Sequence, residues 1–110
     1  MRIWQFEQFG IANLKLQTAG TPTPGPGEVV LDVKALSLNY RDLMVVKGQY
    51  NPRLRLPATP ISDGAGVISA VGPGVSRVKV GNRVNSHFIA GWIGGPMEAE
   101  YVRTTLGTPG

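Results

Sequence analysis

Residues 56–84 (LPATPISDGAGVISAVGPGVSRVKVGNRV) constrain the fold of this chain more than any other segment. Glycines fall at turn positions between short apolar alternations, which predicts a strand, a turn and a second strand. Residues 67–71 are apolar on both faces and indicate a buried strand, and Gly-Pro-Gly at 72–74 predicts a tight turn. Gly64 and Gly66 follow Asp63 and allow close approach, which predicts either a contact surface for a backbone or flat ligand, or simply a β-bulge.

The composition fits one small, turn-rich β domain. The 110 residues include 15 glycines and 9 prolines, yet 42% are hydrophobic, which argues against a disordered tract. A domain of this length has only a small core. The absence of cysteine excludes a disulfide framework and a thiolate zinc site, and the single histidine, His87, is interpreted as an ordinary surface or rim residue.

Charge and hydropathy exclude several classes of partner. The net charge of +4 is spread along the chain without a dense basic stripe, so no nucleic-acid partner is expected. No apolar run approaches 18 residues, and the start MRIWQFEQFG has neither a signal-peptide core nor a cleavage site. We therefore expect no membrane partner, no secretory signal and a cytoplasmic location.

Strands are also expected before residue 56, at residues 2–9, 14–16 and 29–38. The last is the strongest strand pattern. Val29, Leu31, Val33 and Ala35 share one face opposite polar residues, which predicts a half-buried strand. The proline-rich stretch 21–27 is interpreted as an internal loop and not as a domain linker.

A short helix is expected over residues 40–47. Asn39 is an N-cap type residue, Asp42 lies three positions later, and Gly48 ends the apolar run. Residues 49–60 hold three prolines and are expected to form a loop. A second helix is predicted over 96–106, in preference to a strand at 98–102.

Three segments together resemble the N-terminal domain of medium-chain dehydrogenases/reductases. They are residues 27–48, residues 57–66 and VGPGVSRVKVGNRV at 71–84, and the resemblance covers nearly the whole chain. It implies a mainly β fold, a GroES-like, partly open β-barrel with one or two short helices. It also implies that residues 1–110 are an incomplete catalytic domain of an NAD(P)-dependent oxidoreductase, whose dinucleotide-binding Rossmann domain is absent from this chain.

Zinc-dependent members of that superfamily hold a catalytic zinc with a cysteine and a histidine, which this chain lacks. The cysteine position reads Leu-Asn-Tyr at 38–40, and Ser62 stands at the histidine position. An amide and a hydroxyl do not replace thiolate and imidazole on zinc. The resemblance therefore implies the zinc-independent branch of quinone oxidoreductases and enoyl reductases, in which NADPH passes hydride to a quinone, an enone or a related carbonyl compound.

The resemblance also supplies candidate site residues. Hydrogen-bond donors would hold the carbonyl oxygen where negative charge develops, and the candidates are Asn39, Tyr40, Tyr50 and Ser62. Tyr50 matches a tyrosine that faces the substrate in enoyl reductases and is the catalytic candidate. The alternative is that its side chain only covers the loop. For Asn39 the alternative is N-capping alone, and for Tyr40 it is packing. Ser62 is expected to line the cleft without taking part in chemistry.

The remaining candidates are structural. Asp42 is expected to cap the helix, Asp63 to order the turn, and Gly64 and Gly66 to permit close approach. Residues 81–84 read Gly-Asn-Arg-Val where the family usually has aspartate second. Asparagine tolerates a left-handed turn equally well, so the substitution puts only a local hydrogen bond in question.

No G-x-G-x-x-G motif is present, and 110 residues leave no room for a dinucleotide-binding domain. The chain is thus expected to supply one wall of a cleft, to bind NADPH negligibly alone and to turn over nothing. The implied partners are the missing Rossmann domain, a small-molecule substrate and, for the parent enzyme, a second subunit. The alternative is a stand-alone GroES-like binding or assembly module, or an inactive truncated paralogue.

Overall fold

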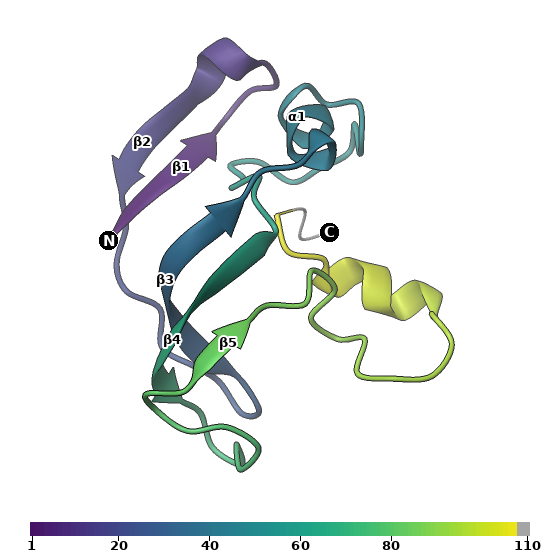
Figure 1. Ribbon diagram of the computed structural model, residues 1–110. Coiled ribbons are helices and arrows are strands. Elements are labelled where there is room, and N and C mark those ends of the chain that lie inside the picture. Colours follow the sequence, from purple (N-terminus) through teal and green to yellow (C-terminus); the bar gives the residue numbers. More distant parts are fainter. Residues whose placement is uncertain (108–110) are drawn as a thin grey trace.

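The computed structural model describes residues 1–107, which form two antiparallel sheets and short helices (Figure 1). The mainly β fold with short helices expected from the sequence is confirmed. The elements in chain order are β1 (Arg2–Phe6), η1 (Ile11–Asn13), β2 (Leu14–Thr18), β3 (Val29–Ser37), α1 (Tyr40–Val46), β4 (Asp63–Val71), β5 (Arg83–Asn85) and η2 (Ala99–Thr104). None of the helices in this described part has the length and hydropathy that crossing a bilayer requires.

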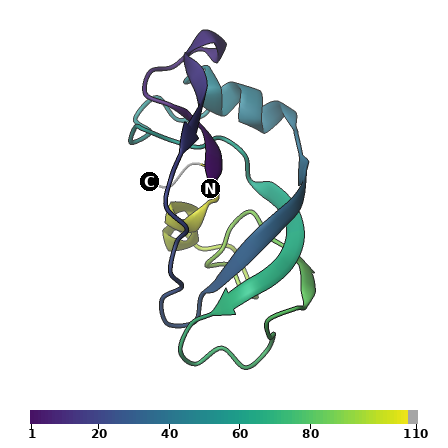
Figure 2. The ribbon, with the colours of Figure 1, turned by 90° about the vertical axis from the view of Figure 1, so that its left-hand side faces the viewer.

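The first sheet is the pair β1–β2, with Arg2 opposite Thr18 and Phe6 opposite Leu14. The second sheet has the order β3-β4-β5. Figure 2 shows the two sheets on opposite sides of the molecule, with α1 across one end. This arrangement brings the C-terminal end of β3, the start of α1 and the start of β4 to the same part of the fold.

The principal core lies beneath α1 and not beneath the larger sheet. It consists of buried side chains from β1, α1 and the loop that follows the helix: Phe6, Val45, Val46, Leu54 and Ala58. Phe6 and Ala58 exchange two backbone hydrogen bonds of 3.0 Å, which fix the predicted loop against β1. Each such large apolar side chain contributes about 1.5–3 kcal/mol when it leaves water, so this cluster anchors the helix that begins at the candidate site.

The larger sheet is less buried than its sequence predicts. Val29, Val33 and Ala35 of β3 are exposed, and Leu31 is only partly buried. In β4 Ile68 is buried, whereas Ser69 and Val71 are exposed. The expectations of a half-buried β3 and a fully buried β4 were wrong, because the principal core is assembled from α1 and β1 instead.

Gly66 settles one ambiguity of the sequence. A Cβ built at this position would lie 2.1 Å from the carbonyl oxygen of Asp32 on β3, a distance that no real side chain tolerates. The register between β3 and β4 shifts close by, between Val33 and Ala35, as in a β-bulge. Gly66 therefore admits the backbone of β3 next to a bulge, so the structure has both the close approach of a backbone and the bulge.

The turns are where the sequence predicts them, at residues 72–74 and at Gly81-Asn82. Gly74 has a φ of 79° in the expected turn at 72–74. Residues 78–82 form a further turn, closed by hydrogen bonds between Lys79 and Asn82, so only β5 remains extended. Gly81 takes the left-handed conformation, and Asn82 instead accepts a hydrogen bond from the Lys79 N–H at 3.0 Å.

The C-terminal helix is confirmed in place of the strand at 98–102, although it is the 3₁₀ helix η2 and begins at Ala99 after the N-cap Glu98. It therefore does not start at Pro96. Thr105, directly after η2, pairs with Ile89 in an isolated bridge, and Leu106 N–H donates to Phe88 at 2.7 Å. These bonds return the chain toward the candidate site.

Candidate functional site

Asn39 joins two roles at the start of α1. Its backbone is extended, and its side-chain Oδ1 accepts a hydrogen bond from the Arg41 N–H at 3.0 Å. In return the Asn39 N–H donates to Asp42 Oδ2 at 2.9 Å, which completes a capping box. These two hydrogen bonds confirm the predicted capping role of Asn39 and Asp42. Asp42 is buried.

The other end of the Asn39 amide reaches a residue 24 positions away. Nδ2 donates to Asp63 Oδ2 at 2.8 Å, and Asp63 is the first residue of β4. This hydrogen bond ties the start of the helix to the start of the strand. The structure therefore brings together two residues that the sequence treated separately, one as a donor and the other as a turn residue.

Asp63 also lines a hollow of about 350 Å³. Its other lining residues come from the last residues of β3, the start of β4 and the end of β5: Ala35, Leu36, Ser37, Gly64, Ala65, Asn85 and Ser86. Small side chains form much of this lining, and the polar groups are a carboxylate, an amide and hydroxyls. Such a surface presents hydrogen-bonding groups around a shallow, partly apolar space.

Ser62 and Ser86 stabilise the entry to β4. Ser62 is only 4% exposed and does not line this hollow. Ser86 Oγ accepts from the Gly64 N–H at 3.3 Å, and its single hydroxyl hydrogen faces the carbonyl oxygens of Gly64 at 3.3 Å and of Ser62 at 3.5 Å. The cleft-lining role of Ser62 stays a prediction. Ser86 carried no motif signal, because its contacts are with residues more than 20 positions away.

The two candidate tyrosines occupy different surroundings. Tyr40, the first residue of α1, is 72% exposed. Tyr50, 44% exposed, lies against the side chain of Arg41, whose guanidinium carbon is 4.6 Å from the centre of the tyrosine ring. A cation over an aromatic face is attracted by the ring quadrupole. Arg41 therefore orients Tyr50, while Tyr40 has no comparable fixed contact in the described residues.

Arg41 also connects α1 to the C-terminal segment. Its Nη2 donates to the Leu106 carbonyl oxygen at 3.2 Å, and its guanidinium carbon lies 5.9 Å from the centre of the Phe88 ring. Arg41 is not among the site residues predicted from the sequence. Its place in Leu-Asn-Tyr-Arg-Asp, between two candidates, was the only available signal.

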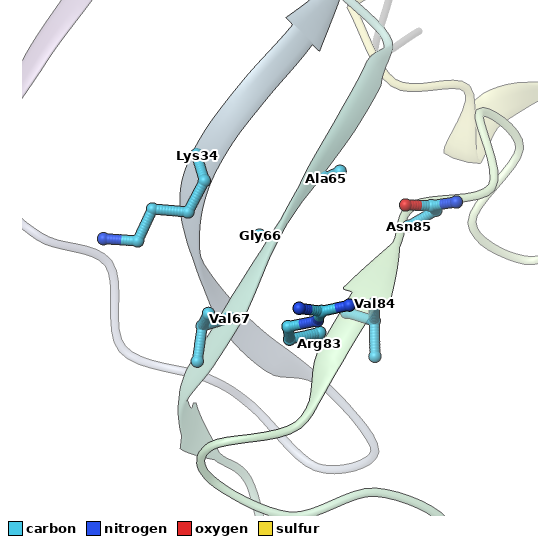
Figure 3. A pocket seen from close by; sticks show the side chains of 7 residues that line it. All are labelled: Lys34, Ala65, Gly66, Val67, Arg83, Val84 and Asn85. Carbon is cyan, nitrogen blue, oxygen red and sulfur yellow. The ribbon is translucent and has the colours of Figure 1, made fainter.

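A second hollow of about 450 Å³ lies further along the sheet, beside Gly66 (Figure 3). Lys34 and Arg83 bring positive charge to it, but Figure 3 shows the Lys34 side chain extending away from Arg83. Lys34 is paired instead with Asp32 at 2.6 Å, with both side chains more than half exposed. Exposed pairs of this kind contribute little energy, and the charges do not converge on one point.

Metal-ligating side chains do not gather in residues 1–107. No three histidine, cysteine, aspartate or glutamate side chains lie close enough to hold an ion in this part of the chain. His87 is exposed, its Nδ1 lies 3.1 Å from the Ile89 N–H, and its ring meets Trp92 edge-on at 5.8 Å. The donors at the site are thus amide, hydroxyl and phenol groups, which bind an oxygen on which negative charge develops.

Comparison with known proteins gives a consistent set of relatives. The family model described as alcohol dehydrogenase GroES-like domain matches residues 25–108. Among curated proteins, the human synaptic vesicle membrane protein VAT-1 homolog is 48% identical over 77 residues, which are 68% of this chain and 20% of that protein. The chain spans about a fifth of the length of the first curated relatives that it matches.

Two solved structures with a similar fold contain bound ligands. Quinone oxidoreductase from Escherichia coli, solved in complex with NADPH, has a TM-score of 0.73 and 29% identity, over 77% of this chain and 26% of that one. A thermostable alcohol dehydrogenase from Pyrobaculum aerophilum, solved with cobalt and zinc, has a TM-score of 0.70 and 42% identity, over 77% and 26%. The same fold therefore occurs in a protein solved with NADPH and in one solved with bound metal.

Proposed function

Because the chain belongs to the family of alcohol dehydrogenase GroES-like domains, we propose that it forms the substrate-side wall of an NAD(P)H-dependent oxidoreductase. The reaction is hydride transfer to a quinone, an enone or a related carbonyl compound. The observation that carries this proposal is the Asn39 amide, which is held by Arg41 and Asp63 beside a hollow lined by small and polar residues.

Zinc is the metal that part of this family implies, and the residues present do not fit it. The Asn39 oxygen accepts from the Arg41 N–H, and its nitrogen donates to Asp63. Ser62, at the other position expected from the resemblance, is a buried neutral hydroxyl. Zinc prefers thiolate, imidazole and carboxylate ligands. We therefore place the chain in the zinc-independent branch and route no step through a metal.

The chemistry assigned to this chain is stabilisation of charge. NADPH, when bound by the complete enzyme, supplies the hydride. As the carbonyl compound accepts it, negative charge builds up on the carbonyl oxygen. In the proposed site an Asn39 N–H donates to that oxygen. Removal of one such donor typically lowers kcat by about 10²–10³-fold.

Tyr50 is the proposed second donor. Its ring is held from one side by Arg41, and it remains 44% exposed, so the side chain is both oriented and accessible. A phenol hydroxyl donates a hydrogen bond, or gives its proton to the enolate that forms when an enone accepts hydride, and the phenolate is then reprotonated by solvent. Tyr40 is assigned to the lining of the cleft without a chemical step, and the buried Ser62 is assigned no contact with the substrate.

The rest of the assembly belongs to the same proposal. The cofactor would be held mainly by a Rossmann domain outside this sequence, which has no G-x-G-x-x-G segment of its own. The complete enzyme acts in the cytoplasm on a small molecule and pairs with a second copy. Residues 1–110 alone bind NADPH negligibly and are inactive.

A chimera tests this function. Residues 1–107 replace the matching part of the Escherichia coli quinone oxidoreductase, and NADPH oxidation is followed with p-benzoquinone and with cyclohex-2-enone. We expect NADPH-dependent reduction that survives a zinc chelator, and neither reduction nor saturable NADPH binding by the isolated chain. A chimera that folds and binds NADPH but reduces neither probe would count against the proposal, as would activity that the chelator abolishes.

A further inference from the structure

The amide of Asn39 has one orientation that satisfies both of its neighbours. Oδ1 faces the Arg41 N–H at 3.0 Å, and Nδ2 faces the Asp63 carboxylate at 2.8 Å. Reversing the amide would set two N–H donors against each other at Arg41 and two oxygens against each other at Asp63. The direction of this side chain is therefore determined by its partners.

Arg41 and Asp63 require different hydrogen-bonding groups from the Asn39 side chain. Arg41 needs only an oxygen acceptor, which an aspartate at position 39 would also provide. Asp63 needs an N–H donor, because its carboxylate accepts only. The helix cap alone would leave the amide nitrogen without a fixed direction, so the contact with Asp63 is what determines where the NH₂ group lies.

The NH₂ group has a second N–H. No acceptor within residues 1–107 takes it, and Asn39 is exposed. Asp63 is itself part of the hollow of about 350 Å³, and the Asn39 amide, which does not line that hollow, is joined to it by the hydrogen bond to Asp63. The same hydrogen bond fixes the direction of the second N–H, which stays available to an acceptor from outside residues 1–107.

We infer that Asp63 is a positioning residue: its carboxylate fixes the Asn39 amide so that the remaining N–H donates to the carbonyl oxygen of the substrate. This inference rests on the proposed function for the identity of that oxygen. It gives Asp63 a role that differs from ordering a turn, because the role acts through the side chain of Asn39 and needs an acceptor at position 63.

Nuclear magnetic resonance of the ¹⁵N-labelled chain tests the inference without cofactor or substrate. The NH₂ resonances of Asn39 are assigned by their loss in Asn39→Asp, which keeps the helix cap. In the wild-type chain we expect an order parameter of about 0.8 for the Asn39 NH₂ group, and in Asp63→Leu a value below about 0.6. Asp63→Asn, which retains an acceptor oxygen, should restore the order.

Backbone resonances of α1 serve as the folding control, and the exposed side chain of Gln49 is the internal reference for a free amide. An Asn39 NH₂ group as mobile as that of Gln49 in the wild type would overturn the inference. Unchanged order in Asp63→Leu would overturn it equally. If Asp63→Leu does not fold, Asp63→Ala provides the same comparison. Failure here would show that Asp63 does not hold the Asn39 amide, whereas failure of the reductase proposal would appear as a chimera that binds NADPH but reduces neither probe, so the two failures are distinguishable.

Discussion

At the scale of single residues, Gly66 and Gly64 differ although they lie two positions apart in β4. A Cβ at Gly66 would meet the carbonyl oxygen of Asp32 at 2.1 Å, which is backbone and does not move aside. A Cβ at Gly64 would lie 3.5 Å from the end of the Leu36 side chain, an ordinary contact. Neither glycine has a positive φ, so the difference between them comes from space alone.

Gly66→Ala should therefore lower the free energy of unfolding by about 3 kcal/mol, as overpacking against a fixed neighbour does. Gly64→Ala is the matched control and should change it by less than about 1 kcal/mol. Urea unfolding of the two variants measures the difference. Equal losses would show that the bulge of β3 does not depend on Gly66.

Asn39 shows how far sequence reasoning reaches at this scale. Its capping role was predictable because the partners, Arg41 and Asp42, are its neighbours in sequence. Its contact with Asp63 was not, because that contact depends on how β3, α1 and β4 come together in space. For the same reason Ser86 gave no signal before the structure placed it beside Gly64.

At the scale of elements, α1 is held at both ends by different interactions. The capping box fixes its start, and the buried Val45 and Val46 attach its last turn to the core. Arg41 adds a link from its first turn to the C-terminal segment through the Leu106 carbonyl oxygen. A helix of seven residues is not stable alone, so these contacts determine its position.

Arg41→Ala should lower the free energy of unfolding by about 2 kcal/mol, because it removes a charged hydrogen bond and the cation–π contact with Tyr50. Arg41→Lys should have an intermediate effect, since lysine keeps the charge but not the planar group. The exposed Lys47 at the end of the same helix is the control. If thermal unfolding gives equal losses for Arg41→Ala and Lys47→Ala, the link has no structural importance.

Local signals predicted elements better than they predicted burial. The helix beginning at Tyr40, the turn at 72–74 and the long strands followed from capping, glycine and alternation. A second turn at Gly81-Asn82 also followed from its residues, and Lys79 and Asn82 close it directly before β5. Burial of β3 and β4 was overestimated because an apolar face indicates only that a strand is suited to packing, not that this chain supplies the partner.

At the scale of the whole molecule, exposed apolar side chains on β3 favour association between copies of the chain. Val33 is 50% exposed and Leu36 is 54% exposed, and within residues 1–107 β3 pairs with β4 on one side only. A long strand with one unpaired edge and apolar side chains favours association with another chain. The isolated chain is therefore expected to associate at high concentration.

Size-exclusion chromatography over a concentration series tests this expectation. Wild-type chain should elute earlier as concentration rises, and Leu36→Lys should shift elution toward the monomer by placing a charge on β3. Ile11→Lys, which changes an equally exposed residue near β2, is the control. A defined sevenfold ring would instead favour a stand-alone assembly module.

The proposed reaction depends on Asn39 as the hydrogen-bond donor. Exchanging the side chains of residues 39 and 63 tests this role separately from the helix cap. The double variant Asn39→Asp with Asp63→Asn keeps an oxygen for the Arg41 N–H and keeps a hydrogen bond between positions 39 and 63. It moves the NH₂ group from residue 39 to residue 63. The fold should therefore remain while the donor is displaced.

The decisive measurement is kcat/KM for p-benzoquinone in the chimera that carries this exchange. We predict a loss of about 10²-fold with an unchanged unfolding midpoint and unchanged NADPH affinity, because one donor to the developing charge has been displaced. A chimera with the exchange that reduces the quinone at the wild-type rate would contradict the claim that the Asn39 amide stabilises the carbonyl oxygen.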